Sequence, residues 1–125
     1  MSKDISLTEA ESKLANLIWR DVSLTSPDLV TLAEQELSWK KSTTYTILKK
    51  LCDKGVVKNE NAKVSVILTR EQQMSRQSHS YIQNTFGGSL PRFIASFIGG
   101  RNLSPEEVLQ LRQLIDTYDG GDADD

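Results

Sequence analysis

Apolar residues recur at helical spacing in three successive stretches of the first 54 residues. The first begins behind Thr8 and Glu11, whose spacing is that of a capping box, and continues through Ile18. In the second, "TSPDLVTLAEQEL", Ser26 is the expected N-cap and Pro27 the first helical residue. The third covers about residues 42–54, with Gly55 as its expected end. The pattern therefore predicts three helices in a row.

The pattern changes after Gly55 from helical spacing to runs of β-branched residues. Residues 56–59 ("VVKN") and 63–69 ("KVSVILT") are both rich in strand-forming side chains, and only "ENA" separates them. Two such runs with a short connection predict a β-hairpin. Three helices followed by a hairpin is the order of elements in a winged helix-turn-helix.

The rest of the chain returns to helical patterns. Residues 70–86 are polar with a weak apolar stripe, residues 89–98 are strongly one-sided, and residues 104–118 begin with another capping box. Pairs of glycines at 87–88 and 99–100 are expected to end the first two. The predicted fold class is mainly α with a small β-hairpin. The predicted organisation is a winged-helix DNA-binding domain at 1–69, a helical dimerisation region at 70–118 and a disordered acidic tail at 119–125.

The C-terminal helices carry apolar faces that the winged helix does not need for its own core. The residues expected to form a dimer interface are Leu90, Phe93, Ile94, Phe97, Ile98, Leu111, Leu114 and Ile115. A contiguous exposed apolar surface promotes aggregation unless something covers it. The alternative is that these faces pack back onto their own domain, but a homodimer is the favoured interpretation.

The distribution of charge changes what the total suggests. The net charge is −2, which by itself argues against a nucleic-acid binder. Between Ser38 and Lys63, however, seven lysines face only two acidic residues, a local net charge of +5. A local basic region governs contact with a polyanion more than the total does.

The third predicted helix separates hydroxyl and ammonium groups from its leucines. The candidate DNA-binding residues, including two lysines beside the hairpin turn, are Lys41, Ser42, Thr43, Tyr45, Thr46, Lys49, Lys50, Lys58 and Lys63. Hydroxyls and methyls can meet base edges in a major groove, and lysines can meet phosphates. The competing interpretation is that this is only the solvated face of an amphipathic helix. The following hairpin and the local charge favour DNA.

Three segments of the chain resemble the penicillinase-repressor family of winged-helix regulators, which includes the methicillin-resistance and copper-responsive repressors. They are "LTEAESKLANLIW", "STTYTILKKLCDKGVV" and "LSPEEVLQLRQLID", and with the residues between them the resemblance covers about residues 5–116. It implies a homodimeric bacterial repressor with an N-terminal winged helix for DNA and C-terminal helices for dimerisation. It also places Thr43, Thr46 and Lys50 on the recognition helix.

Two features depart from particular branches of that family. In the β-lactam-responsive members, a signal relayed from a membrane sensor protease leads to cleavage of an Asn-Phe bond in the dimerisation region. The matching pair here, the candidate proteolytic inactivation site, is Ser96-Phe97, so the asparagine is replaced. The copper-responsive members carry a C-terminal cysteine cluster, whereas the one cysteine here is Cys52.

Together these patterns predict a homodimeric transcriptional repressor that binds a pseudo-palindromic operator through a recognition helix at about residues 42–54. The alternative function is a winged-helix protein-interaction module without sequence-specific DNA binding. The sequence shows no nucleophile–base pair and no phosphate-binding glycine motif, so we expect no enzymatic activity and no cofactor. No Cys/His cluster predicts a metal site, and no apolar run predicts a signal peptide or membrane insertion, so the expected location is cytoplasmic.

Overall fold

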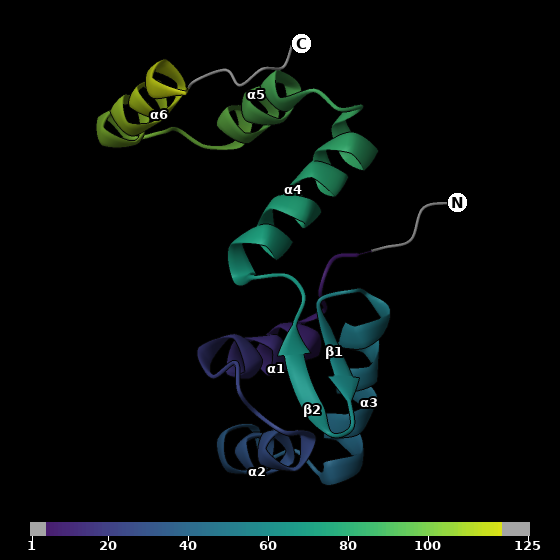
Figure 1. Cartoon of the computed structure of the whole chain (residues 1–125). Coiled ribbons are helices and arrows are strands. Elements are labelled where there is room, and N and C mark those ends of the chain that lie inside the picture. The colour runs from purple at the N-terminus through teal and green to yellow at the C-terminus, as the bar shows by residue number, and fades with distance from the viewer. Residues whose placement is uncertain (1–4, 119–125) are drawn as a thin grey trace. The chain divides into compact units, whose positions relative to one another are not determined.

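The computed structural model describes residues 5–118, so the expected tail at 119–125 lies outside the described residues (Figure 1). The elements are α1 (Glu9–Arg20), α2 (Ser26–Leu37), α3 (Lys41–Asp53), β1 (Val57–Glu60), β2 (Lys63–Val66), α4 (Arg70–Phe86), α5 (Leu90–Gly100) and α6 (Pro105–Thr117). The predicted order of three helices, a hairpin and three helices is confirmed. The chain forms two compact units, which divide between Tyr81 and Ile82. The division falls within α4, so this helix contributes to both units.

Side-chain caps define where most of the helices begin. The predicted boxes at Thr8–Glu11 and Ser104–Glu107 are both present. For α2 the prediction is wrong by one residue, because Thr25 rather than Ser26 is the N-cap and forms a box with Asp28. Ser26 is instead a buried residue of the first helical turn.

The first unit has a core that closes on itself. Its fully buried members come from all three helices and the hairpin, and they include Leu14, Ile18, Leu29, Leu48, Leu51, Val56 and Val64. Burial of this kind is the main source of stability in a small domain. The hydrophobic face of α3 therefore packs against α1 and α2, and the opposite face of the helix is exposed to solvent.

The hairpin is the wing of the winged helix and is fixed at its tip. Asn61 and Ala62, with φ of 53° and 66°, form the two-residue turn, and the register pairs Glu60 with Lys63. Positive φ at both turn residues is the geometry that suits a two-residue hairpin. The backbone N–H of Ser26 donates to the carbonyl of Ala62 at 2.7 Å, and a β-bridge joins Thr25 to Lys63. The hairpin is thereby tied to the start of α2.

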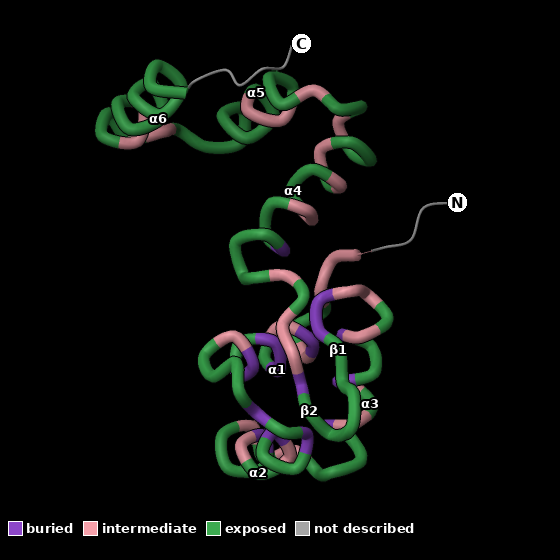
Figure 2. The backbone as a smooth tube through the Cα atoms, viewed as in Figure 1, coloured by how far each residue is buried: buried purple, intermediate pink, exposed green. Residues whose placement is uncertain are grey.

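The second unit has no buried interior within the described residues. Figure 2 shows buried positions concentrated in the winged helix, and the last buried residue along the chain is Gln73, on α4. Neither α5 nor α6 buries any of its residues. The helix α5 ends at the glycine pair, as predicted, but it includes Gly99 and Gly100 in its last turn and has its C-cap at Arg101.

Candidate nucleic-acid interface

The two faces of α3 differ in both chemistry and exposure. Thr44, Leu48 and Leu51 are buried, and the Thr44 hydroxyl donates to the carbonyl of Lys40 at 3.3 Å. The exposed positions of the helix are Lys41, Ser42, Thr43, Thr46, Lys49, Lys50 and Asp53. More than three turns of α3 therefore present hydroxyl and ammonium groups, together with the Asp53 carboxylate, on a helix that the core holds in place.

The N-terminal turn of α3 lacks the capping that the other helices have. Its N-cap is Lys40, whose side chain offers no acceptor, and no acidic residue lies in the first turn. Side-chain acceptors cap α1, α2, α5 and α6, and Thr69 and Gln72 form reciprocal hydrogen bonds at the start of α4. The positive end of the α3 dipole is thus reinforced by lysine rather than offset by a carboxylate.

Acidic neighbours reduce the local positive charge. The ammonium of Lys49 lies 3.6 Å from the Asp53 carboxylate, and that of Lys58 lies 3.5 Å from Glu60. Both pairs are exposed, so water screens them and neither binds its lysine firmly. A phosphate could therefore replace either carboxylate as the partner of its lysine at little cost in free energy.

Lys54, which adds to the positive charge counted in the sequence, has a structural task instead. Its ammonium donates to Glu11 Oε1 and to the carbonyl of Ser6, each at 2.6 Å, and the Glu11 side chain is only 3% exposed. Burial alone would raise the pKa of the Glu11 carboxyl, but the hydrogen bonds from Lys54 and Thr8 outweigh it and hold that pKa below its ordinary value. Lys54 is therefore engaged within the fold and is not one of the exposed lysines of α3 and the wing.

The two candidate residues on the wing are exposed on its outer side. Lys58 and Lys63 share one face of the hairpin with Glu60, because Lys58 pairs across with Ser65 and Glu60 with Lys63. Val57 and Val64 occupy the other face and are buried. The wing thus presents two lysines and one glutamate on a hairpin that is held at its tip.

Tyr45 occupies a different place from the other candidates. It is half-buried and packs against the core, and its hydroxyl donates to Ser26 Oγ at 3.4 Å. The phenol thus joins α3 to the start of α2. This contact supports a packing role for Tyr45, which is one of the DNA-binding candidates predicted from the sequence.

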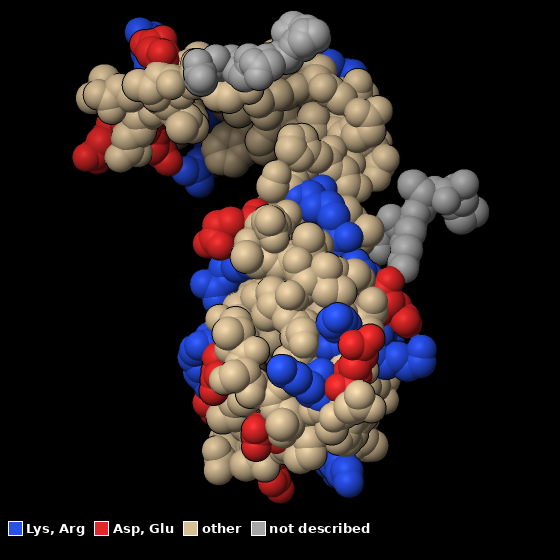
Figure 3. Space-filling view, viewed as in Figure 1, with Lys and Arg blue, Asp and Glu red and all other residues tan. Residues whose placement is uncertain are grey.

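The second unit presents the predicted apolar residues at its surface. Among them, Leu90 is 57% exposed, Leu114 67% and Ile115 70%. Phe93 packs edge-on against Phe86 with ring centroids 5.4 Å apart, and a hollow of about 360 Å³ between α5 and α6 is lined by Phe93, Ile94, Phe97, Ile98, Leu103 and Leu111 with three other residues. In the view of Figure 3, tan dominates the surface over α5, and α6 shows red and blue patches at its edges. The winged helix shows interleaved charges of both signs in the same view.

Ser96 and Phe97, the candidate proteolytic site, lie inside α5 and are both exposed. Arg101 lies over the Phe97 ring at 5.2 Å and pairs with Glu107 on α6 at 3.5 Å. A helical backbone does not fit the extended conformation that most proteases bind, so cleavage there would require local unfolding. Cleavage at this bond stays a prediction.

Other kinds of site have little support in the described part of the chain. Residues 5–118 contain no group of three or more His, Cys, Asp or Glu residues placed to hold a metal ion. None of their helices is long and apolar enough to cross a membrane. Burial raises the pKa of the Cys52 thiol, and the Asp53 carboxylate adds to that effect, which lowers the reactivity of the sulfur.

The predictions made from the sequence missed two residues, Lys40 and Gln73. Lys40 looks like part of a linker but is the exposed N-cap of α3. Gln73 lies in a polar segment yet is 1% exposed, whereas its apolar neighbour Met74 is 55% exposed. The uncapped "WKKST" start was a readable signal for Lys40, while nothing in the local sequence marks Gln73.

Comparison with known proteins identifies the family to which this chain belongs. The family model described as penicillinase repressor matches residues 7–117. The penicillinase repressor of Bacillus licheniformis is 22% identical over 122 residues, which span 94% of this chain and 95% of that protein. The methicillin resistance regulatory protein MecI of Staphylococcus aureus (strain N315) is 21% identical over 118 residues, 91% of this chain and 96% of that one. A solved structure of MarR from Listeria monocytogenes aligns with 18% identity and a TM-score of 0.46, over 90% of this chain and 72% of its own. The extent of the family match shows that this chain belongs to the penicillinase repressor family.

Proposed function

We propose that this protein is a transcriptional repressor that binds a two-fold symmetric operator as a homodimer. The observation that carries the proposal is α3, which buries its leucines and exposes seven polar or charged residues along more than three turns. The family match and the names of the relatives, penicillinase repressor and methicillin resistance regulatory protein, support the same function.

In this proposal α3 enters the major groove. Thr43 and Thr46 meet base edges through their hydroxyls and methyls, and Lys50 meets a phosphate. Lys40 and Lys41 at the uncapped end of the helix lie where a phosphate would also meet backbone N–H groups. Lys58 and Lys63 on the outer face of the wing supply further phosphate contacts.

The dimer is proposed to form through the apolar faces of α5 and α6. No residue from Met74 to Tyr118 is buried within one chain, although this stretch carries most of the strongly apolar residues of the second half. A helical segment without an interior gains its hydrophobic stabilisation from a partner. A second copy is the simplest partner, because two-fold symmetry then supplies two recognition helices for two half-sites.

The experiment is selection of duplexes from a random pool, followed by fluorescence anisotropy on the selected operator at two salt concentrations. We expect enrichment of a pseudo-palindrome. Thr46→Ala should weaken operator binding by about 1–3 kcal/mol and lose discrimination at one base pair of each half-site. Lys50→Ala should weaken binding to all sequences alike and lower the salt dependence by about one charge per chain.

The matched control is Lys13→Ala, which removes the same charge from an exposed position on α1 that pairs with Glu9. It should bind as the wild type does. Failure of the wild type to enrich any sequence, even at low salt, would contradict the proposal and favour a protein-interaction module.

A further inference from the structure

The C-terminal end of the proposed recognition helix is bound to α4 through one arginine. A terminal nitrogen of the Arg76 guanidinium donates to the backbone carbonyl of Lys54 at 2.7 Å. Lys54 is the C-cap of α3, where carbonyls lack helical partners and a cation is favoured by the helix dipole. Arg76 is half-buried and therefore meets this carbonyl with limited competition from water.

The backbone at this end of α3 leaves that carbonyl for Arg76. The N–H of Val56 bonds to the carbonyl of Leu51 and the N–H of Gly55 to that of Cys52, the two bonds of a Schellman motif. Gly55 has φ of 79°, and a Cβ placed on it would lie 3.7 Å from a terminal nitrogen of Arg76. The turn itself satisfies the carbonyls of Leu51 and Cys52, and the guanidinium satisfies that of Lys54.

A buried amide holds Arg76 in place. Gln73 Oε1 accepts from Nε of Arg76 at 3.1 Å and from one of its terminal nitrogens at 2.7 Å. The Gln73 side-chain nitrogen donates to the carbonyl of Ile5 and to Gln77 Oε1, each at 2.9 Å. All of the donors and acceptors of this side chain are thus engaged, so its rotamer and that of Arg76 are fixed together.

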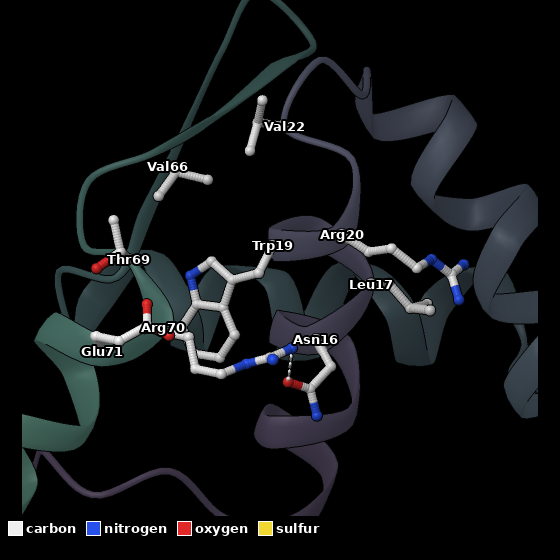
Figure 4. Close-up of a pocket in the computed structure, with 9 residues that line it drawn as sticks. All are labelled: Asn16, Leu17, Trp19, Arg20, Val22, Val66, Thr69, Arg70 and Glu71. Carbon is white, nitrogen blue, oxygen red and sulfur yellow. Dashed lines mark hydrogen bonds between the residues drawn. The ribbon is translucent and has the colours of Figure 1, made fainter.

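A second anchor holds the first turn of α4. The guanidinium of Arg70 lies over the Trp19 ring at 5.6 Å and donates to Asn16 Oδ1 at 3.0 Å, and Figure 4 shows its side chain passing the indole toward Asn16. The indole N–H of Trp19 donates to the carbonyl of Leu68 at 2.9 Å. The start of α4 is thus attached to α1 as well as to α3.

We propose that Arg76 is a positioning residue, which sets the one separation of half-sites that the dimer accepts. This inference rests on the proposed function, because it requires a dimer and a symmetric operator. The helix α4 is continuous from Arg70 to Phe86, and its residues from Ile82 belong to the unit that carries the apolar faces. In the proposed dimer, α4 of each chain connects its recognition helix α3 to the apolar faces. A firm attachment of α4 to α3 therefore narrows the range of distances between the two recognition helices of the dimer. Affinity for the matching spacing then rises, since the second half-site is met at high effective concentration.

The test uses Arg76→Gln and Arg76→Lys in the full chain. The probes are the selected operator, the same duplex with one or two base pairs added or removed at its centre, and a single half-site. For Arg76→Gln we expect about tenfold weaker binding to the operator, a smaller further loss on altered spacings than the wild type shows, and half-site affinity within about twofold of wild type. Arg76→Lys keeps the charge but loses the planar guanidinium, so its operator affinity should lie between those of the wild type and Arg76→Gln.

Arg20→Gln is the matched control, because it removes the same charge from an exposed ion pair with Glu36 and should keep the wild-type spacing profile. An equal loss on the half-site and the operator would overturn the inference, since Arg76 would then act through folding or direct contact. An Arg76→Gln spacing profile identical to wild type would also overturn it. A wild type that does not distinguish operator from half-site would remove the proposed dimer, and this inference with it.

Discussion

The two units of this chain use their apolar residues in opposite ways. In the unit that ends at Tyr81, leucines and valines of three helices and a hairpin meet in one interior, and twelve apolar residues are buried. In the unit that begins at Ile82, the apolar residues of α5 and α6 lie at the surface, and no described residue is buried. Their polar surfaces differ as well, because α3 and the wing expose five lysines, whereas α5 and α6 each expose one arginine, Arg92 and Arg112.

The difference indicates which unit has a hydrophobic core of its own. The winged helix satisfies its own hydrophobic and polar groups, and no buried side-chain nitrogen or oxygen among the described residues lacks a hydrogen bond. The core of this unit therefore does not require the exposed face of α3, which the proposal assigns to DNA recognition. The second unit has helix caps and regular geometry but no buried residue among those described, and the proposed dimer would supply the burial that one chain lacks.

The largest expected effect comes from placing a charge on the exposed apolar face of α6. Leu114→Asp should convert the dimer to monomers, because an aspartate buried at the interface would lose its hydration without a partner. Operator affinity should then fall by about 1,000-fold, since the two half-sites are no longer bound as one unit. Sedimentation velocity measures the first outcome and anisotropy the second.

Gln113→Asp introduces the same charge at the neighbouring exposed position of α6, away from the apolar face, and should remain dimeric. If both variants are dimers with wild-type affinity, the apolar face of α6 is not an interface and the contrast between the two units loses its functional meaning.

The next effect tests the self-sufficiency of the winged helix. Glu11→Gln should destabilise the chain by about 3 kcal/mol, because it leaves the largely buried Lys54 ammonium without its carboxylate. The pKa of Glu11 is lowered in the fold, so its contribution is present above the ordinary carboxyl pKa of about 4.3 and is lost as the pH falls through the lower folded value. Urea unfolding between pH 7 and pH 3 should therefore show a flatter acid dependence in the variant. An unchanged midpoint at pH 7 would show that this pair does not support the core.

A smaller effect is expected at the start of α3, where one substitution should raise the stability of the fold and lower its affinity for DNA. Lys40→Asp supplies the missing cap and complements the dipole, so thermal unfolding should show a gain of about 1 kcal/mol while DNA affinity falls. Lys40→Ser is the matched control, because it caps without a negative charge and should gain stability with a milder loss of binding. Wild-type DNA affinity in Lys40→Asp would place the N-terminal turn of α3 away from phosphates.

Most of the fold could be predicted because its signals are local. The boxes at Thr8 and Ser104, the end of α3 at Gly55 and the change to β-branched residues each act within a few positions. The N-cap of α2 was misplaced by one residue because Thr25 and Ser26 both have cap chemistry. The glycine pair at 99–100 does end α5, although both residues lie in its last turn.

The parts that could not be predicted depend on contacts between distant segments. Lys54 looked like one more lysine of a basic region, but its partner Glu11 lies 43 positions away. Gln73 is buried through a bond to Ile5, 68 positions away, although its own helix is polar. Periodicity does not report such pairs, so the sequence identified the exposed face of α3 better than it identified what holds that face in place.

The most direct test of the central claim is the stoichiometry of the complex with DNA. Sedimentation velocity of the purified protein with a labelled, selected operator should give two chains per duplex, and a half-site duplex should bind far more weakly. One chain per duplex with equal affinity for operator and half-site would contradict the account, because the apolar unit would then contribute nothing to recognition.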